Sequence, residues 1–214
     1  NIAPYQAGKP ISELAREYGL QADRIITLAS NANPLGIPDS ARAAMAAAVD
    51  DLGRYPDSNG FELKAAIAQR YAVPPDWITL GNGSNDILEL AAHSLLQPGS
   101  SAVYSQYSFA VYALAIVVPA RDLGHDLDAI GAAIGADTRL VFIANPNNPT
   151  GTFLPAEAIA GFLATVPRDV VVVLDEAYNE YLDPALRFDS TRWLHQYPNL
   201  IISRTFSKAY GMAG

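Results

Sequence analysis

Residues 203–208 read Ser-Arg-Thr-Phe-Ser-Lys, and residues 170–178 read Val-Val-Val-Val-Leu-Asp-Glu-Ala-Tyr. Each stretch completes a short run of apolar, mostly β-branched residues and then continues into reactive side chains. This is the pattern of a buried parallel strand that ends at a functional loop. Open α/β sheets bind ligands at the carboxyl ends of their strands. The two stretches therefore predict a ligand site at one edge of a parallel sheet.

A third apolar run, Leu140 to Ala144, ends in Asn-Pro-Asn-Asn-Pro-Thr-Gly at 145–151. A lone lysine after a strand is usually an ordinary solvated side chain. Here Lys208 comes with Asp175 and Tyr178, which follow a neighbouring strand, and with the amides of the third loop. An amine, a carboxylate, a phenol and an amide at neighbouring strand ends suit pyridoxal phosphate as the ligand.

The motifs at 147–151, 175–178 and 207–208 resemble those of the fold-type I, pyridoxal-phosphate-dependent aminotransferases (class II). The longer run Arg-Thr-Phe-Ser-Lys-Ala-Tyr-Gly at 204–211 is similar to the histidinol-phosphate aminotransferase branch. Gly-Lys-Pro-Ile at 8–11 and the segments at 30–36 and 81–86 extend the resemblance over nearly the whole chain. It implies an α/β fold in which helices sandwich a mainly parallel sheet, with an N-terminal arm.

The resemblance also implies a role for each matching residue. Lys208 would anchor the cofactor and carry the substrate proton, Asp175 would pair with the pyridine nitrogen, and Tyr178 would hydrogen-bond the ring hydroxyl. These three are the predicted catalytic residues. The predicted cofactor contacts are Tyr55, Gly83, Ser84, Asn85, Tyr107, Asn148, Asp175, Tyr178, Thr205, Ser207 and Lys208, and the predicted substrate contacts are Asn33 and Asn148.

Within that set, Tyr107 would stack on the cofactor ring, and Tyr55 would reach the cofactor phosphate of a two-fold partner in a homodimer. A turn tyrosine and an exposed tyrosine after a strand also have ordinary structural roles, and the Asn33 cluster also reads as a simple turn. Two positions depart from the family pattern. Ala32 stands where glutamate is usual, which weakens the substrate assignment, and Ser108 stands where proline is usual.

The implied reaction is amino transfer between histidinol phosphate and 2-oxoglutarate in histidine biosynthesis. An aminotransferase for aromatic or other amino acids remains open, as does a decarboxylase of the threonine-phosphate type. A non-catalytic regulatory or binding domain is a third reading, which the intact Asp175, Tyr178 and Lys208 disfavour.

Residues 1–36 are expected to form an N-terminal arm or part of a small domain. The resemblance implies that residues 37–214 form a cofactor-binding large domain, incomplete at its C-terminal end. The resemblance implies that a small C-terminal domain and the substrate-binding arginines lie beyond Gly214. Expected helices are 12–18, 39–51, one with a core stripe of Leu63, Ile67 and Tyr71, one with Ile87, Ala91 and Leu95 on one face, one from near Phe109, and 155–166. Expected strands are 25–28, 78–80, 102–104, 116–119, 140–144, 170–174 and 200–203.

The connection from Tyr112 to Val118 is short for a parallel crossover, which takes about a dozen residues. Roughly nine residues are expected to be missing there, by deletion or as a loop absent from the sequence, and the second is favoured.

Composition excludes several classes of function. A net charge of −8 argues against nucleic acid or an anionic membrane as the partner. The chain has no cysteine, and its three histidines lack metal-ligand spacing, so no metal site is expected. No run approaches the roughly 20 apolar residues that span a bilayer. The expected location is the cytoplasm.

Overall fold

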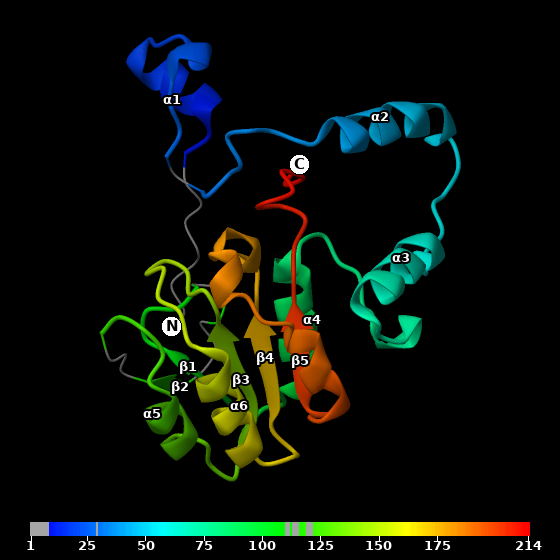
Figure 1. Ribbon diagram of the computed structural model, residues 1–214. Helices are drawn as coiled ribbons and strands as arrows, with labels where there is room; N and C mark the ends of the chain where they lie inside the picture. Colours follow the sequence, from blue (N-terminus) through cyan, green and yellow to red (C-terminus); the bar gives the residue numbers. More distant parts are fainter. Residues whose placement is uncertain (1–8, 29, 110–111, 113–115, 119–121) are drawn as a thin grey trace.

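The computed structural model describes residues 9–28, 30–109, 112, 116–118 and 122–214. Its body is a five-stranded, fully parallel sheet in the order β2-β1-β3-β4-β5. The strands are β1 (Ser101–Ser105), β2 (Ile116–Val118), β3 (Thr138–Ala144), β4 (Val171–Asp175) and β5 (Leu200–Ser203). Figure 1 shows β3, β4 and β5 pointing toward the same end of the molecule. The expected parallel α/β sheet is confirmed.

Successive side chains of each strand point to opposite faces of the sheet and pack into two hydrophobic clusters, one on each face. In β3, Val141 and Ile143 pack with α5 (Leu127–Ala132) and α6 (Ala156–Thr165). Leu140 and Phe142 point to the other face, where α4 (Ser84–Leu95) contributes Leu88 and Ala91. Helices therefore cover both faces, which explains why the strands read as nearly continuous apolar runs.

The remaining α-helices lie outside this body. An arm carries α1 (Ile11–Tyr18), and an arch that leaves the sheet carries α2 (Asp39–Ala48) and α3 (Phe61–Tyr71) (Figure 1). Short 3-10 helices occupy Ala22–Arg24, Val49–Asp51, Pro75–Trp77, Asn179–Tyr181, Pro184–Leu186 and Ser190–His195.

Three expectations for the first 80 residues are wrong. Ile25–Leu28 and Ile78–Leu80 are not strands, because neither segment has a neighbouring strand to bond with in the described part of the chain. The Leu63 stripe of α3 is not core: Leu63 is 44% exposed, and Ala68 is the buried residue of this helix. An apolar stripe becomes a core only where another element covers it.

Some expectations fall on residues outside the described ranges. These are the extended start of the arm, most of the helix expected from near Phe109, and most of the short connection between Tyr112 and Val118.

The arm meets the sheet body at residues 30–36. Asn33 donates its amide N–H to the Ala209 carbonyl over 2.9 Å, and the Gly36 carbonyl lies against Gly211. A side chain does not fit at Gly211, because a Cβ there would overlap the Gly36 carbonyl and because its φ is +70°. The backbone of the arm thus rests directly on the turn after β5.

We expect Gly211→Ala to lower the free energy of unfolding by at least about 2 kcal/mol, through left-handed strain and the overlap with Gly36. Urea unfolding measures the change. The control is Gly161→Ala in α6, where a Cβ meets no atom within 4 Å and the helix gains propensity, by up to about 1 kcal/mol. Equal stability of the Gly211 variant and the wild type would contradict the close approach.

Candidate active site

Asp175 ends β4 and is 6% exposed. Its Oδ2 accepts a hydrogen bond from the Tyr112 hydroxyl over 2.8 Å, and its Oδ1 accepts one from the Ala177 amide over 3.2 Å. Burial raises the pKa of the Asp175 carboxyl, and the two hydrogen bonds lower it. The site thus holds a carboxylate that has donors on both oxygens and little water around it.

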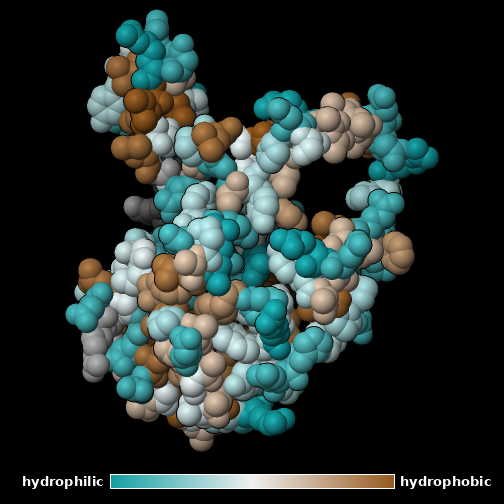
Figure 2. Space-filling model, in the orientation of Figure 1, coloured by the Kyte–Doolittle hydropathy of each residue, from teal (hydrophilic) through white to brown (hydrophobic). Residues whose placement is uncertain are grey.

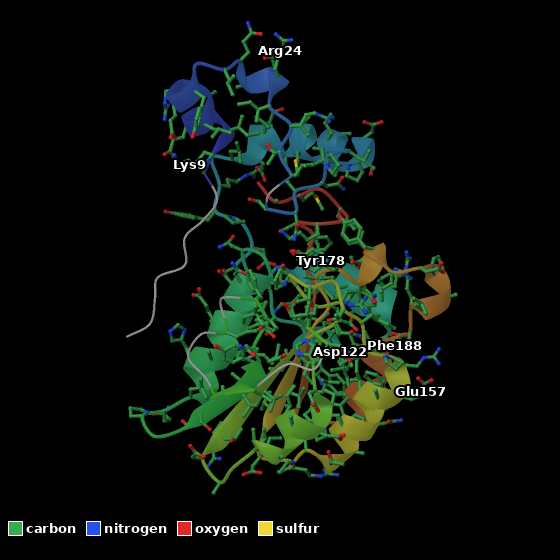
Figure 3. The ribbon with its side chains drawn as sticks, turned by 90° about the vertical axis from the view of Figure 1, so that its left-hand side faces the viewer. Lys9, Arg24, Asp122, Glu157, Tyr178 and Phe188 are labelled. Carbon is green, nitrogen blue, oxygen red and sulfur yellow. The ribbon has the colours of Figure 1, made fainter. Side chains whose placement is uncertain are left out.

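Lys208 lies in the turn after β5, the strand that neighbours β4. Its Nζ donates to the Ser30 carbonyl over 3.2 Å and lies 5.8 Å from the centre of the Tyr178 ring. The amine and the phenol therefore meet at the carboxyl ends of β4 and β5, beside the point where the arm docks. Figure 3 places Tyr178 at the end of the sheet that faces the arm.

A cavity of about 490 Å³ opens beside Tyr178. The third loop contributes Asn148, and the arm contributes Asn31, whose amide donates to the Tyr178 hydroxyl over 2.9 Å. The cavity is lined by Asn31, Ala32, Pro34, Pro146, Asn147, Asn148, Pro149, Gly151, Tyr178, Tyr181 and Leu182. The lining residues include no charged side chain, so a ligand there meets amides, phenols and apolar surface.

The turn after β5 also faces the start of α4. Thr205 Oγ1 and Ser207 Oγ are 3.0 Å apart, and a Cβ built on Gly83 would lie 3.8 Å from Ser207 Oγ. Gly83 caps a twelve-residue helix and supplies no side-chain cap, so backbone N–H groups at this end remain open to a ligand. Two hydroxyls beside a helix N-terminus make a cradle for a phosphate group.

A protein-family model described as "Aminotransferase class I and II" matches residues 23–214. The chain belongs to this aminotransferase family.

The relatives of this chain include histidinol-phosphate aminotransferases. The chain is 69% identical to histidinol-phosphate aminotransferase 1 of Cupriavidus pinatubonensis and 66% identical to histidinol-phosphate aminotransferase 2 of Ralstonia nicotianae. Each match covers all of this chain and 59% of the relative. The alignments are 221 positions long, against 214 residues here, so seven positions of the relatives have no counterpart.

A solved structure has the same fold. Histidinol-phosphate aminotransferase from Sinorhizobium meliloti, in complex with pyridoxal-5'-phosphate, superposes with a TM-score of 0.87 at 30% identity. The match covers 98% of this chain and 58% of that protein. The aminotransferase fold expected from the motifs is thereby confirmed, and the chain spans about three fifths of the length of its aminotransferase relatives.

Other predicted site residues of this aminotransferase chain lie away from the cavity or have other partners. Tyr55 is fully exposed in the link between α2 and α3, so it contributes to no site within its own chain. Tyr107 follows β1, is 43% exposed, and its carbonyl accepts from the Asn147 amide. The Asn33 side-chain amide donates to the Ala209 carbonyl, and its Oδ1 accepts from the Leu35 backbone N–H. Asn85 is exposed in the first turn of α4.

Two residues at the site were not among the predicted ones. Tyr112 holds Asp175, and it is 2% exposed and stacked on Phe142, with ring centres 4.5 Å apart. Asn31 holds Tyr178 from the arm. Tyr112 has no local signal, because its partner lies 63 positions away. Asn31 lies in a turn cluster that the motifs had already marked, which was the available signal.

The described residues contain no group of three or more potential metal ligands, and no helix among them is long and apolar enough to cross a membrane. The three histidines are apart: His125 is buried and contacts the Ala144 backbone, whereas His93 and His195 are exposed.

Proposed function

We propose that the full-length protein is a cytoplasmic, pyridoxal-phosphate-dependent aminotransferase of histidine biosynthesis that moves an amino group between histidinol phosphate and 2-oxoglutarate. The observation that carries the proposal is the meeting of Lys208, Tyr178 and the buried Asp175 at the ends of β4 and β5. The choice of substrate follows the names of the relatives at 66–69% identity.

The residues present fit the cofactor. Gly83 leaves open the space beside Ser207 that a side chain would fill, which suits a phosphate at the N-terminus of α4. Asp175 supplies the buried negative charge that a protonated pyridine nitrogen requires. Lys208 supplies the amine that anchors the aldehyde.

Pyridoxal phosphate, when bound, supplies an electron sink for the negative charge that develops at the substrate Cα. Lys208 would hold the cofactor through its Nζ and would move the proton at the substrate Cα. Burial raises the pKa of Asp175, and the Tyr112 and Ala177 donors, which favour the carboxylate, partly offset that effect; a protonated ring nitrogen beside it would favour the carboxylate further. Tyr178 and Asn148 border the cavity and orient the ring hydroxyl, while Thr205, Ser207 and Ser84 hold the phosphate.

The cavity beside Tyr178 is where the substrate side chain would lie. Ala32 is one of its walls, so an imidazole there meets no carboxylate from this position and depends on the amides of Asn31 and Asn148. This observation supports a second candidate, amino transfer from an aromatic or other amino acid.

Turnover of the full-length protein with 2-oxoglutarate, followed by glutamate formation, tests the proposal. Donors are histidinol phosphate, histidinol, phenylalanine, aspartate and threonine phosphate. We expect kcat/KM to be at least about tenfold higher for histidinol phosphate than for any other donor, a difference of about 1.4 kcal/mol. A higher value for phenylalanine would establish the second candidate, and carbon dioxide release from threonine phosphate would indicate a decarboxylase.

We further propose a homodimer in which each site uses both chains. The arm and the arch expose large apolar side chains that no described residue covers: Tyr18, Leu20, Ile26, Leu28, Leu35, Leu52, Tyr55 and Phe61. Figure 2 shows hydrophobic surface gathered on the lobe where Figure 1 draws α1. Exposed apolar surface of this extent is typical of an interface.

Complementation tests the shared site. If Tyr55 reaches the partner's phosphate, co-expressing a Lys208→Ala chain with a Tyr55→Ala chain should restore about a quarter of the wild-type sites, because half of randomly formed dimers are mixed and one of their two sites is intact. Activity of the purified mixture measures this.

The control pairs Lys208→Ala with Asp175→Ala. Those two residues act within one chain, so the mixture should regain nothing. The absence of any gain in the Tyr55 mixture, or an active monomer in sedimentation, would exclude the shared site.

A further inference from the structure

Past the last paired residues of β4 and β5, the first side chain on each strand belongs to an ion pair. Asp175 is paired with Ser203 in the ladder, so Glu176 and Arg204 come next and lie side by side. Arg204 donates from both Nε and Nη2 to Glu176 Oε2, over 2.9 and 2.7 Å. The backbone continues the link, because the Glu176 amide donates to the Ser203 carbonyl over 2.8 Å.

The pair is shielded from water. The Glu176 side chain is 2% exposed and that of Arg204 is 23% exposed. Arg204 also reaches the buried Ser190 hydroxyl over 3.4 Å, and its guanidinium lies 4.8 Å from the centre of the Tyr71 ring of α3. A buried pair of this kind makes a small net contribution to stability, but removing one partner leaves an uncompensated charge.

The pair lies on the other side of the sheet from Asp175. Side chains alternate along a strand, so Glu176 points away from the face where Tyr112 holds Asp175. Its neighbour Ser190 belongs to the 3-10 helix Ser190–His195, which packs with the α5 and α6 cluster. Glu176 and Arg204 therefore act on the ligand through other residues.

What the pair connects is the two halves of the site. Asp175 precedes Glu176 directly, and Thr205, Ser207 and Lys208 follow Arg204 within four residues. The proposed cofactor must be held by both halves at once, with its ring on the β4 side and its phosphate on the β5 side. The distance between the halves then determines whether one rigid ligand satisfies both.

We propose that Glu176 and Arg204 are a positioning pair that sets the spacing between Asp175 and the Thr205–Lys208 turn, and so determines how tightly pyridoxal phosphate is bound. The inference rests on the proposed function. The role of Arg204 then depends on the geometry of its two hydrogen bonds to Glu176 as well as on its charge, because that geometry fixes the spacing between the two strand ends.

Two variants separate positioning from charge balance. Arg204→Met leaves Glu176 buried and unpaired, so both the thermal midpoint and cofactor affinity should fall. The double variant Glu176→Leu with Arg204→Met removes both charges and keeps the net charge unchanged. Replacing both partners of a buried pair is often neutral for stability, so its thermal midpoint should return to near that of the wild type.

The decisive measurement is cofactor binding by the full-length double variant. We expect its dissociation constant for pyridoxal phosphate to stay at least about tenfold above the wild-type value, a loss of about 1.4 kcal/mol. The visible circular dichroism of the bound cofactor should also weaken, because a loosely held ring is less uniformly oriented. The matched control is Arg192→Met, which removes an exposed arginine and its 3.4 Å contact with Asp189 and should change neither quantity.

The outcomes are distinguishable. Wild-type affinity and dichroism in the double variant would overturn the positioning role while leaving the proposed function intact. Loss of cooperative unfolding in the double variant would also overturn it, since the pair would then be required for folding. Failure of the wild type to bind pyridoxal phosphate would instead contradict the proposed function.

Discussion

Lys208→Ala is expected to abolish the visible absorbance band that pyridoxal phosphate gives on binding and to lower amino transfer by at least about 10⁴-fold. In the proposed function the residue has two tasks, anchoring the cofactor and moving the proton at the substrate Cα, so its loss would remove both. Its neighbours support this assignment: the Nζ points to the Ser30 carbonyl and the Tyr178 ring rather than to a carboxylate. Absorbance titration and steady-state turnover of the full-length protein measure the two effects.

Lys64→Ala is the matched control, because Lys64 lies on α3, in the arch that leaves the sheet. It should keep both the band and the rate. Persistence of the band in the Lys208 variant would remove this residue from its role and leave the cofactor without an anchor among the predicted residues.

Asp175→Asn is expected to lower kcat by at least about 10³-fold while changing cofactor affinity far less. The substitution keeps the shape of the side chain and removes its charge. In the proposed function that charge would pair with the ring nitrogen and would stabilise the transition state, in which negative charge develops at Cα, more than the bound ground state. A loss below about tenfold would mean that Asp175 has a structural role.

Tyr112→Phe gives a graded comparison at the same carboxylate. It removes the 2.8 Å hydrogen bond to Asp175 Oδ2 and keeps the ring that stacks on Phe142. In the wild type this hydrogen bond lowers the pKa of Asp175, so the pKa of Asp175 should be higher in the variant. Because activity needs the carboxylate, the acid limb of the pH–rate profile should move to higher pH. An unchanged limb would show that Tyr112 only packs.

Strands β1, β3 and β4 were predictable because most of their side chains, on both faces of the sheet, are buried. β5 begins and ends at the predicted residues, and β1, β3 and β4 differ from their predicted bounds by one or two positions. The segment Ile78–Leu80 has the same apolar character and is not a strand. A strand requires a bonded neighbour, which composition alone does not reveal.

Site residues that follow the end of a strand could be predicted from the sequence. Site residues that are brought in by contacts between distant segments could not. Asp175 and Lys208 stand at strand ends, and parallel pairing brings such ends together. Asn31 lies 147 positions from Tyr178, and Tyr112 lies 63 positions from Asp175. No periodicity links those pairs, so their contacts are visible only in the folded chain.

The sequence by itself determined the parallel sheet, the groups at its carboxyl edge and the aminotransferase family, because each of these depends on short continuous stretches of residues. The tertiary structure alone decided which donors surround Asp175, which arm residue meets Tyr178, and that Glu176 and Arg204 become partners. The physical reason is register: pairing Asp175 with Ser203 places Glu176 beside Arg204, and a shift of β5 by one residue would turn Arg204 to the opposite face of the sheet.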